Sequence, residues 1–322
     1  MPSLKSRLVA FVLRHSRKKA FSSPDELHAW LAWARPRQNH RPPARLLKRV
    51  DIREATVGGH PFYEVRPKAG AGGMHILYLH GGAYCFEITQ YHWNLIAEMA
   101  ERLSATVSVP IYPLAPEHDV NDIFAVGMAA YRRAVETAAP GRLVLMGDSA
   151  GGNMAVVLTM MAAREELPLP SKLALISPGL DMTLENPEVY EVERLDPWLG
   201  IPGGLEAIRL YAPGLDRSDW RISPIKGDLS VLPATLILAG THDILTPDTT
   251  RFAALAVEAG ADVELVVEPG MFHVWPLIDM PEARRARDRI VAFLSEPAPT
   301  AAEAARAQAR DPSLNASIVA RM

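Results

Sequence analysis

The stretch Gly147-Asp148-Ser149-Ala150-Gly151-Gly152 decides the fold of this chain. It follows the short apolar run Leu143–Met146 and precedes the helix-like segment Asn153–Ala163. In this strand–turn–helix context the pattern Gly-x-Ser-x-Gly presents a reactive serine on a sharp, strained turn. The turn also places the serine at a helix amino terminus, which favours a developing negative charge. We therefore predict that Ser149 is a nucleophile that forms an acyl-enzyme; a glycine turn without chemistry is the alternative.

Short apolar runs alternate with amphipathic stretches from about residue 50 to residue 298. The apolar runs are Met74–Leu79, Ala105–Ile111, Leu143–Met146, Lys172–Ile176, Ala234–Ala239 and Val263–Val267. The helix-like segments are Trp93–Leu103, Ile123–Ala138, Gly152–Glu166, Thr249–Ala259 and Ala283–Leu294. Buried strands separated by helices indicate an α/β protein with βαβ units and a mainly parallel sheet. Two earlier segments, around Val50–Thr56 and Phe62–Val65, are compatible with antiparallel edge strands.

A serine hydroxyl needs a base, and the base needs an orienting acid. Where the serine lies on such a turn, the order along the chain is nucleophile, acid, histidine. Only two histidines follow the serine, His242 and His273. His242 is the immediate neighbour of Asp243, so these two are a poor pair, whereas Asp243 itself ends a predicted strand, where catalytic loops gather. We predict Asp243 as the acid and His273 as the base. Two other carboxylates stay open as the acid, Asp181 and Asp248.

The segment His80-Gly81-Gly82-Ala83-Tyr84 follows the predicted strand Met74–Leu79. Glycines let a backbone approach a substrate closely, and free N–H groups there can stabilise an oxyanion, together with the N–H of the residue after the nucleophile. We predict an oxyanion hole built from Gly81, Gly82, Ala83 and Ala150.

These motifs together resemble the hormone-sensitive-lipase-like branch of the α/β-hydrolases, which includes many bacterial carboxylesterases. The resemblance covers roughly residues 50 to 295. It rests on His80–Tyr84, Tyr112-Pro113-Leu114-Ala115-Pro116-Glu117, Gly147–Gly151, Ser177-Pro178 with Asp181, Asp243 and Phe272-His273. It implies an α/β-hydrolase fold, with a mainly parallel eight-stranded sheet flanked by helices and a helical cap. It also implies a carboxylesterase for short- to medium-chain acyl esters that uses no metal or organic cofactor.

Three positions depart from the family pattern. Ala83 stands where the family usually has a third glycine, although an alanine still donates its N–H. Ile244 replaces the proline that commonly follows the acid, and Pro113 replaces the arginine common before Leu-Ala-Pro-Glu. These departures weaken the placement within the superfamily more than the catalytic assignment.

The resemblance and the changes of composition along the chain predict a domain organisation. Residues 1–45 look helical and basic. Residues 183–220 are rich in prolines and aromatic side chains and interrupt the alternation of predicted strands and helices. We expect both to form the cap, residues 46–182 and 221–298 to form the catalytic domain, and residues 299–322 to form a carboxy-terminal tail. Four aromatic side chains are candidates for the substrate pocket, with core or cap packing as the alternative: Tyr84, Trp198, Tyr211 and Trp275.

Charge is distributed unevenly along the chain. Residues 1–50 hold twelve Lys/Arg and two Asp/Glu, a net charge of +10, which leaves 22 basic and 35 acidic side chains, a net charge of −13, in the remainder. A basic arm on an acidic body is compatible with contact with an anionic surface. We favour a solvated helical face that pairs with the body's own carboxylates, and the question of peripheral membrane contact stays open.

The single cysteine, Cys85, excludes an intramolecular disulfide and a thiolate-rich metal site, and we expect it to be a small buried hydrophobe. The apolar run Leu8–Leu13 is short and flanked by arginines, so it does not look like a secretory signal. We expect a cytoplasmic protein with a small-molecule ester substrate, no nucleic-acid partner and no transmembrane segment. A homodimer through sheet edges or cap helices is compatible with the sequence.

Other activities fit the same residues. Amide, formamide and lactone hydrolysis and acyl transfer all pass through a tetrahedral oxyanion, so the proposed serine, histidine and hole would serve each of them. A lipase would differ in acyl-chain length and in its response to an oil–water interface. A non-catalytic ligand-binding protein on the same fold is the remaining alternative, and the presence of all three triad residue types argues against it.

Overall fold

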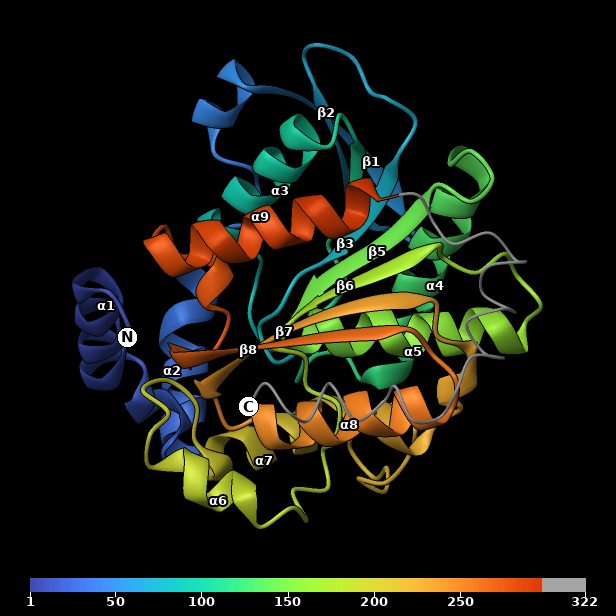
Figure 1. Cartoon of the computed structure of the whole chain (residues 1–322). Helices are drawn as coiled ribbons and strands as arrows, with labels where there is room; N and C mark the ends of the chain where they lie inside the picture. Colours follow the sequence, from blue (N-terminus) through green and yellow to red (C-terminus); the bar gives the residue numbers. More distant parts are fainter. Residues whose placement is uncertain (297–322) are drawn as a thin grey trace.

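The computed structural model describes residues 1–296 and contains one eight-stranded sheet in the order β1-β2-β4-β3-β5-β6-β7-β8 (Figure 1). The strands are β1 (Val50–Val57), β2 (His60–Pro67), β3 (His75–Leu79), β4 (Thr106–Pro110), β5 (Leu143–Asp148), β6 (Lys172–Ile176), β7 (Ala234–His242) and β8 (Val263–Phe272). β2 runs antiparallel to both of its neighbours, β1 and β4. The other neighbouring pairs are parallel. The predicted mainly parallel eight-stranded sheet is therefore confirmed.

Nine α-helices accompany the sheet in the part of the chain that the structure describes. They are α1 (Leu4–Ser16), α2 (Pro24–Ala34), α3 (Gln90–Arg102), α4 (Val120–Thr137), α5 (Ala150–Arg164), α6 (Glu188–Glu193), α7 (Ile201–Tyr211), α8 (Thr246–Glu258) and α9 (Pro281–Ser295). Helices α3 and α9 lie on one face of the sheet, and α4, α5 and α8 lie on the other (Figure 1). Each face has its own apolar core, which includes Trp93 and Ile290 on the first face and Met154 and Phe252 on the second.

The central strands are buried on both faces, which explains their continuous apolar sequences. Every residue of β3, β5 and β6 is buried. Because side chains of a strand alternate between its two faces, strands covered by helices on both sides need apolar residues at successive positions. Three strands are longer than the apolar runs that predict them: β5 continues through Asp148, β7 to His242 and β8 to Phe272.

The amino-terminal arm and the insertion between β6 and β7 lie beside one another. The arm contributes α1, the short 3₁₀ segment Lys18–Phe21 and α2, whereas the insertion contributes α6 and α7. Helix α2 packs against α7, and the 3₁₀ segment also contacts α7. The division of the chain into a cap and a catalytic domain at the boundaries given above stays a prediction.

Among residues 1–296, no helix combines the length and the apolar character needed to cross a membrane. The predicted tail, residues 299–322, lies outside the described residues.

Candidate active site

Ser149 lies on the turn that joins β5 to α5. Its backbone has φ 53° and ψ −119°, a conformation that non-glycine residues rarely adopt. A Cβ at Gly151 would lie 2.0 Å from the carbonyl oxygen of Leu79, so only glycine allows α5 to start this close to β3. The strain is held in place because the Ser149 N–H donates to the Ile176 carbonyl at 2.8 Å. The result is a half-buried hydroxyl at the carboxyl edge of the sheet.

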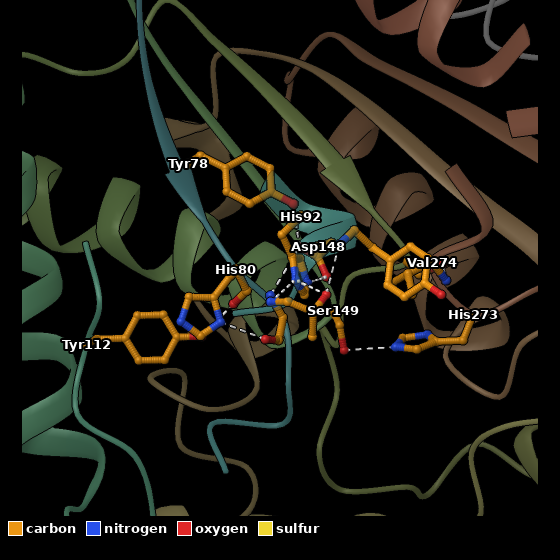
Figure 2. Close-up of polar contacts among 12 residues, drawn as sticks. Tyr78, His80, His92, Tyr112, Asp148, Ser149, His273 and Val274 are labelled. Carbon is orange, nitrogen blue, oxygen red and sulfur yellow. Dashed lines mark hydrogen bonds and ion pairs between the residues drawn. The ribbon is translucent and has the colours of Figure 1, made fainter. Parts of the chain in front are cut away.

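His273 connects the serine to an acid. Its Nε2 lies 2.9 Å from Ser149 Oγ, and its Nδ1 lies 2.9 Å from Asp243 Oδ2 (Figure 2 shows the serine contact). Asp243 follows β7 and His273 follows β8, and the sheet order brings both strand ends to the edge where Ser149 lies. Asp243 is fully buried and His273 is 4% exposed. The three side chains singled out in the sequence are thus brought together in one hydrogen-bonded chain.

Electrostatics around His273 favour its protonated form. Burial by itself would lower the pKa of His273, but the charge of Asp243 and the hydrogen bond to it raise that pKa above its ordinary value of 6.5. Asp196 and Asp148 add smaller contributions in the same direction. An imidazole in this setting is a stronger proton acceptor than a free histidine.

The loop after β3 carries free backbone donors beside the serine. Among the described residues, the N–H groups of Gly82, Ala83 and Ala150 make no hydrogen bond within the chain. The N–H of Gly81, in contrast, donates to Asp148 Oδ1 at 3.1 Å, so this residue has no donor left for a substrate. Ala83 adopts φ 54°, which explains why glycine is common at its position in the family resembled.

The carboxylate of Asp148 holds this loop in place through hydrogen bonds, a role that the sequence analysis did not predict (Figure 2). Its Oδ1 accepts from Tyr78 Oη at 2.6 Å as well as from the Gly81 N–H, and its Oδ2 lies 3.2 Å from His92 Nε2. His92 Nδ1 accepts the Thr89 N–H at 2.9 Å, so its proton lies on Nε2 and is donated to Asp148. Burial raises the pKa of Asp148, but His92 and Tyr78 more than offset this and hold it below its ordinary value. The sequence did contain a signal for this role, because Asp148 is a carboxylate that ends a predicted buried strand directly before Ser149.

His80 is a structural member of the same loop. It is fully buried, its ring stacks on Tyr112 at 4.3 Å between centroids, and its Nδ1 lies 2.7 Å from the Gly81 carbonyl oxygen. Burial lowers the pKa of His80 to about 4, so the ring is neutral and donates from Nδ1. Tyr112 Oη in turn donates to the His80 carbonyl oxygen.

A second buried carboxylate, Asp196, lies next to the proposed acid and was also missed. Its Oδ2 accepts the Ile244 N–H at 3.0 Å, and its Oδ1 accepts the N–H groups of Trp198 and Leu199 at 2.7 and 2.8 Å. Burial and the nearby charge of Asp243 raise the pKa of Asp196 to about 6. Through these hydrogen bonds, Asp196 links the insertion to the turn that carries Asp243. No local pattern in the sequence marks it.

The other candidates for the acid and the base lie elsewhere. Asp181 Oδ1 accepts from Thr183, and Asp248 Oδ1 accepts from the side-chain amide of Asn186 at 3.0 Å. In the described part of the chain neither carboxylate bonds to a histidine, and His242 bonds to no carboxylate.

Three of the four aromatic pocket candidates are packed inside the protein. Tyr84, Tyr211 and Trp275 are 1–3% exposed, and Tyr84 Oη donates to Asn153 Oδ1 at 2.8 Å. Trp198 is only partly buried, and its ring meets the ring of His273 edge-on at 5.9 Å between centroids. Trp198 is therefore the one of these four rings that is partly exposed, and contact of any of the four with a substrate stays a prediction. Cys85 is fully buried, and burial raises the pKa of its thiol to about 12.

Comparison with known proteins gives consistent matches. Residues 76–277 match the family model described as alpha/beta hydrolase fold. An esterase of Acinetobacter venetianus is 31% identical over 251 residues, which span 76% of this chain and 82% of that protein. An acetyl-hydrolase of Streptomyces hygroscopicus is 34% identical over 242 residues, 74% of this chain and 81% of that protein. The crystal structure of a hormone-sensitive lipase from a metagenome library superposes with a TM-score of 0.78 at 30% identity, covering 92% of this chain and 99% of that one.

Proposed function

Because the chain belongs to the hormone-sensitive-lipase-like branch of the α/β-hydrolase family and is a carboxylic ester hydrolase, we propose that it cleaves short- to medium-chain acyl esters through an acyl-enzyme on Ser149. The observation that carries this proposal is the position of His273, 2.9 Å from both Ser149 Oγ and Asp243 Oδ2. The name acetyl-hydrolase carried by one relative supports a small acyl group.

In the acylation half of the proposed reaction, Asp243 accepts a hydrogen bond from the Nδ1–H of His273 and fixes the tautomer in which Nε2 carries no proton. His273 Nε2 then takes the Ser149 Oγ proton as the oxygen attacks the ester carbonyl carbon. The new oxyanion accepts hydrogen bonds from the N–H groups of Gly82, Ala83 and Ala150. The imidazolium passes its proton to the departing alcohol, which leaves an ester on Ser149.

Deacylation repeats the same steps with water. His273 removes a proton from a water molecule, whose oxygen attacks the acyl carbon, and the same N–H groups bind the second oxyanion. Collapse of this intermediate breaks the bond to Ser149 Oγ, which recovers its proton from His273. The carboxylic acid leaves and the enzyme returns to its starting state.

Labelling with a fluorophosphonate, followed by peptide mass spectrometry, tests the nucleophile. We expect one adduct, on Ser149, and none in Ser149→Ala. His273→Ala should lose nearly all turnover of a p-nitrophenyl ester and keep the far-ultraviolet circular dichroism of the parent protein. An adduct on another serine, or turnover near that of the parent in His273→Ala, would contradict the assignment.

A series of p-nitrophenyl esters from acetate to palmitate tests the substrate class. We expect kcat/KM to be highest among the short and medium acyl chains. A maximum at palmitate with a rate that rises at an oil–water interface would identify a lipase instead. Faster cleavage of matched anilides or lactones than of the esters would favour the amidase or lactonase alternative.

A further inference from the structure

Helix α1 exposes an apolar stripe that runs from its first residue, Leu4, to Val12. Leu4, Leu8, Phe11 and Val12 are 80%, 63%, 60% and 53% exposed. A helix advances about 100° per residue, so side chains at these spacings lie on one face in a stripe about 100° wide. Contiguous exposed apolar side chains of this kind mark a contact surface in a folded protein.

The stripe is not the face by which α1 is held to the protein. Ser6 and Leu13, on the opposite side of the helix, are the two buried residues of α1. Ser3 caps the helix and hydrogen-bonds through its N–H and hydroxyl to the Glu282 carboxylate of α9. Helix α1 lies at one edge of the molecule, away from the sheet (Figure 1). It is therefore a docked helix with one face against the body and an apolar face toward solvent.

Basic side chains border the stripe on both sides. Helical spacing puts Lys5 along one edge and Arg7 and Arg14 along the other. Residues 1–22 contain six Lys/Arg and no Asp/Glu. Within the described residues, only two of these six form ion pairs with carboxylates: Lys5 with Asp279, and Lys19 with Glu26. The expected pairing of the arm with the body's own carboxylates thus leaves α1 with unneutralised positive charge.

We propose that α1 docks this protein on an anionic lipid surface, with the stripe in the acyl–headgroup boundary and the guanidinium of Arg7 at the phosphates. An apolar face flanked by Lys and Arg is the pattern of helices that lie in a membrane interface. A second copy of this chain fits less well. A two-fold contact through α1 would bring together two helices whose charged side chains are all basic, and these charges would repel one another. The membrane partner instead supplies the opposite charge over its whole surface.

Helix α1 and the residues that follow it are hydrogen-bonded to residues 193–199 of the insertion, which lie beside His273 and Asp243. Arg14 donates to the Leu195 carbonyl at 2.8 Å, and Lys18 donates to the carbonyls of Glu193, at 3.0 Å, and Leu199. This segment carries Asp196 and Trp198, whose contacts with the Asp243 turn and His273 are described above. Docking through α1 therefore keeps the part of the insertion next to the triad close to the lipid surface.

Flotation of the full-length protein with vesicles tests the proposal. We compare phosphatidylcholine alone with phosphatidylcholine and phosphatidylglycerol in roughly a 2:1 ratio. The variants are Leu8→Gln, Phe11→Gln and the pair together, since glutamine is a good helix former. Leu169→Gln is the matched control, because Leu169 is an exposed leucine (41%) that lies between α5 and β6. Thermal melting of each variant, followed by circular dichroism, reports its fold.

We expect the parent and Leu169→Gln to bind the anionic vesicles, and to bind neutral vesicles more weakly. The double variant should bind at least about tenfold less tightly with an unchanged melting temperature. Raising the salt to about 1 M should remove the preference for anionic lipid. Absence of binding by the parent, or equal binding by the parent and the double variant, overturns the proposal. The proposal is also overturned, in favour of a second copy of the chain, if the parent binds no vesicles and sediments as a dimer while the double variant sediments as a monomer.

Discussion

Replacing Gly82 with alanine should inactivate the proposed oxyanion hole while leaving most of the protein intact. Gly82 has φ +129°, and a Cβ there would lie 2.5 Å from the carbonyl oxygen of Phe86. Ordinary van der Waals contact begins near 3.4 Å, so the loop must give by about 0.9 Å. Phe86 cannot simply move away, because its N–H donates to the Gly82 carbonyl at 2.9 Å and closes the same turn.

The expected magnitude follows from this displacement. Hole donors have to lie within about 0.5 Å of their working positions, and a misplacement of about 1 Å can cost about 10² in rate. Loss of one hole donor costs about 10²–10³. We therefore expect Gly82→Ala to lower kcat/KM for p-nitrophenyl acetate by about 10²–10³. The loss should fall on kcat, because these N–H groups bind the oxyanion of the transition state more tightly than the ground-state carbonyl.

The assay is steady-state hydrolysis of p-nitrophenyl acetate well below the melting temperature of each variant. Gly204→Ala is the control: Gly204 lies in α7, and a Cβ there meets nothing within 4 Å. This control should keep full activity and gain up to about 1 kcal/mol of stability from its better helix propensity. A Gly82→Ala enzyme that keeps kcat/KM within about tenfold of the parent would refute the reasoning about the loop.

Four further results are expected. Asp243→Asn should lower kcat by about 10⁴ without unfolding the protein, because His273 would then adopt the tautomer whose Nε2 carries the proton and cannot act as a base. A loss smaller than about tenfold, measured with the same ester, would point to another acid. The raised pKa of His273 means that kcat/KM should fall as the pH drops through a midpoint above 6.5, because the base must be unprotonated; a midpoint below 6.5 in a pH–rate profile would contradict this. Asp196→Asn removes a carboxylate that favours protonated His273, so that midpoint should move to lower pH, and an unchanged or higher midpoint would show that its charge does not reach the histidine. Gly203→Ala should lower the melting temperature by about 1.5–4.5 °C, because its Cβ would lie 2.5 Å from Phe21 Cα in the arm; calorimetry showing a higher melting temperature would mean that the arm moves freely against α7.

The part of the site that could be predicted depends on local patterns and on chain order. Ser149 lies in a strand–turn–helix signature that is complete within a few residues. His273 is predicted because only two histidines come after the serine, and Asp243 because it follows a predicted strand. The positions of the strands also followed, because burial on both faces imposes apolar runs that are visible without any structure.

What could not be predicted depends on contacts between distant segments. Asp196 meets Ile244 across 48 residues, and His92 meets Asp148 across 56, and neither pair leaves a pattern in the chain. For Tyr84, Tyr211 and Trp275 the sequence leaves pocket lining and core or cap packing open, because large aromatic side chains serve in both places. The Gly81 N–H was counted as a hole donor because its partner, the Asp148 carboxylate, comes from another strand.

The proposed base, His273, directly follows β8, which is the last strand along the chain and lies at one outer edge of the sheet. It meets a serine that lies 124 residues earlier in the chain. A chain still being synthesised therefore holds the serine and its turn long before it holds the histidine. If His273 is the base, an intermediate that has not yet added this edge strand has an inert Ser149 hydroxyl. Recovery of ester turnover after dilution from denaturant would then report the joining of β8 to the sheet.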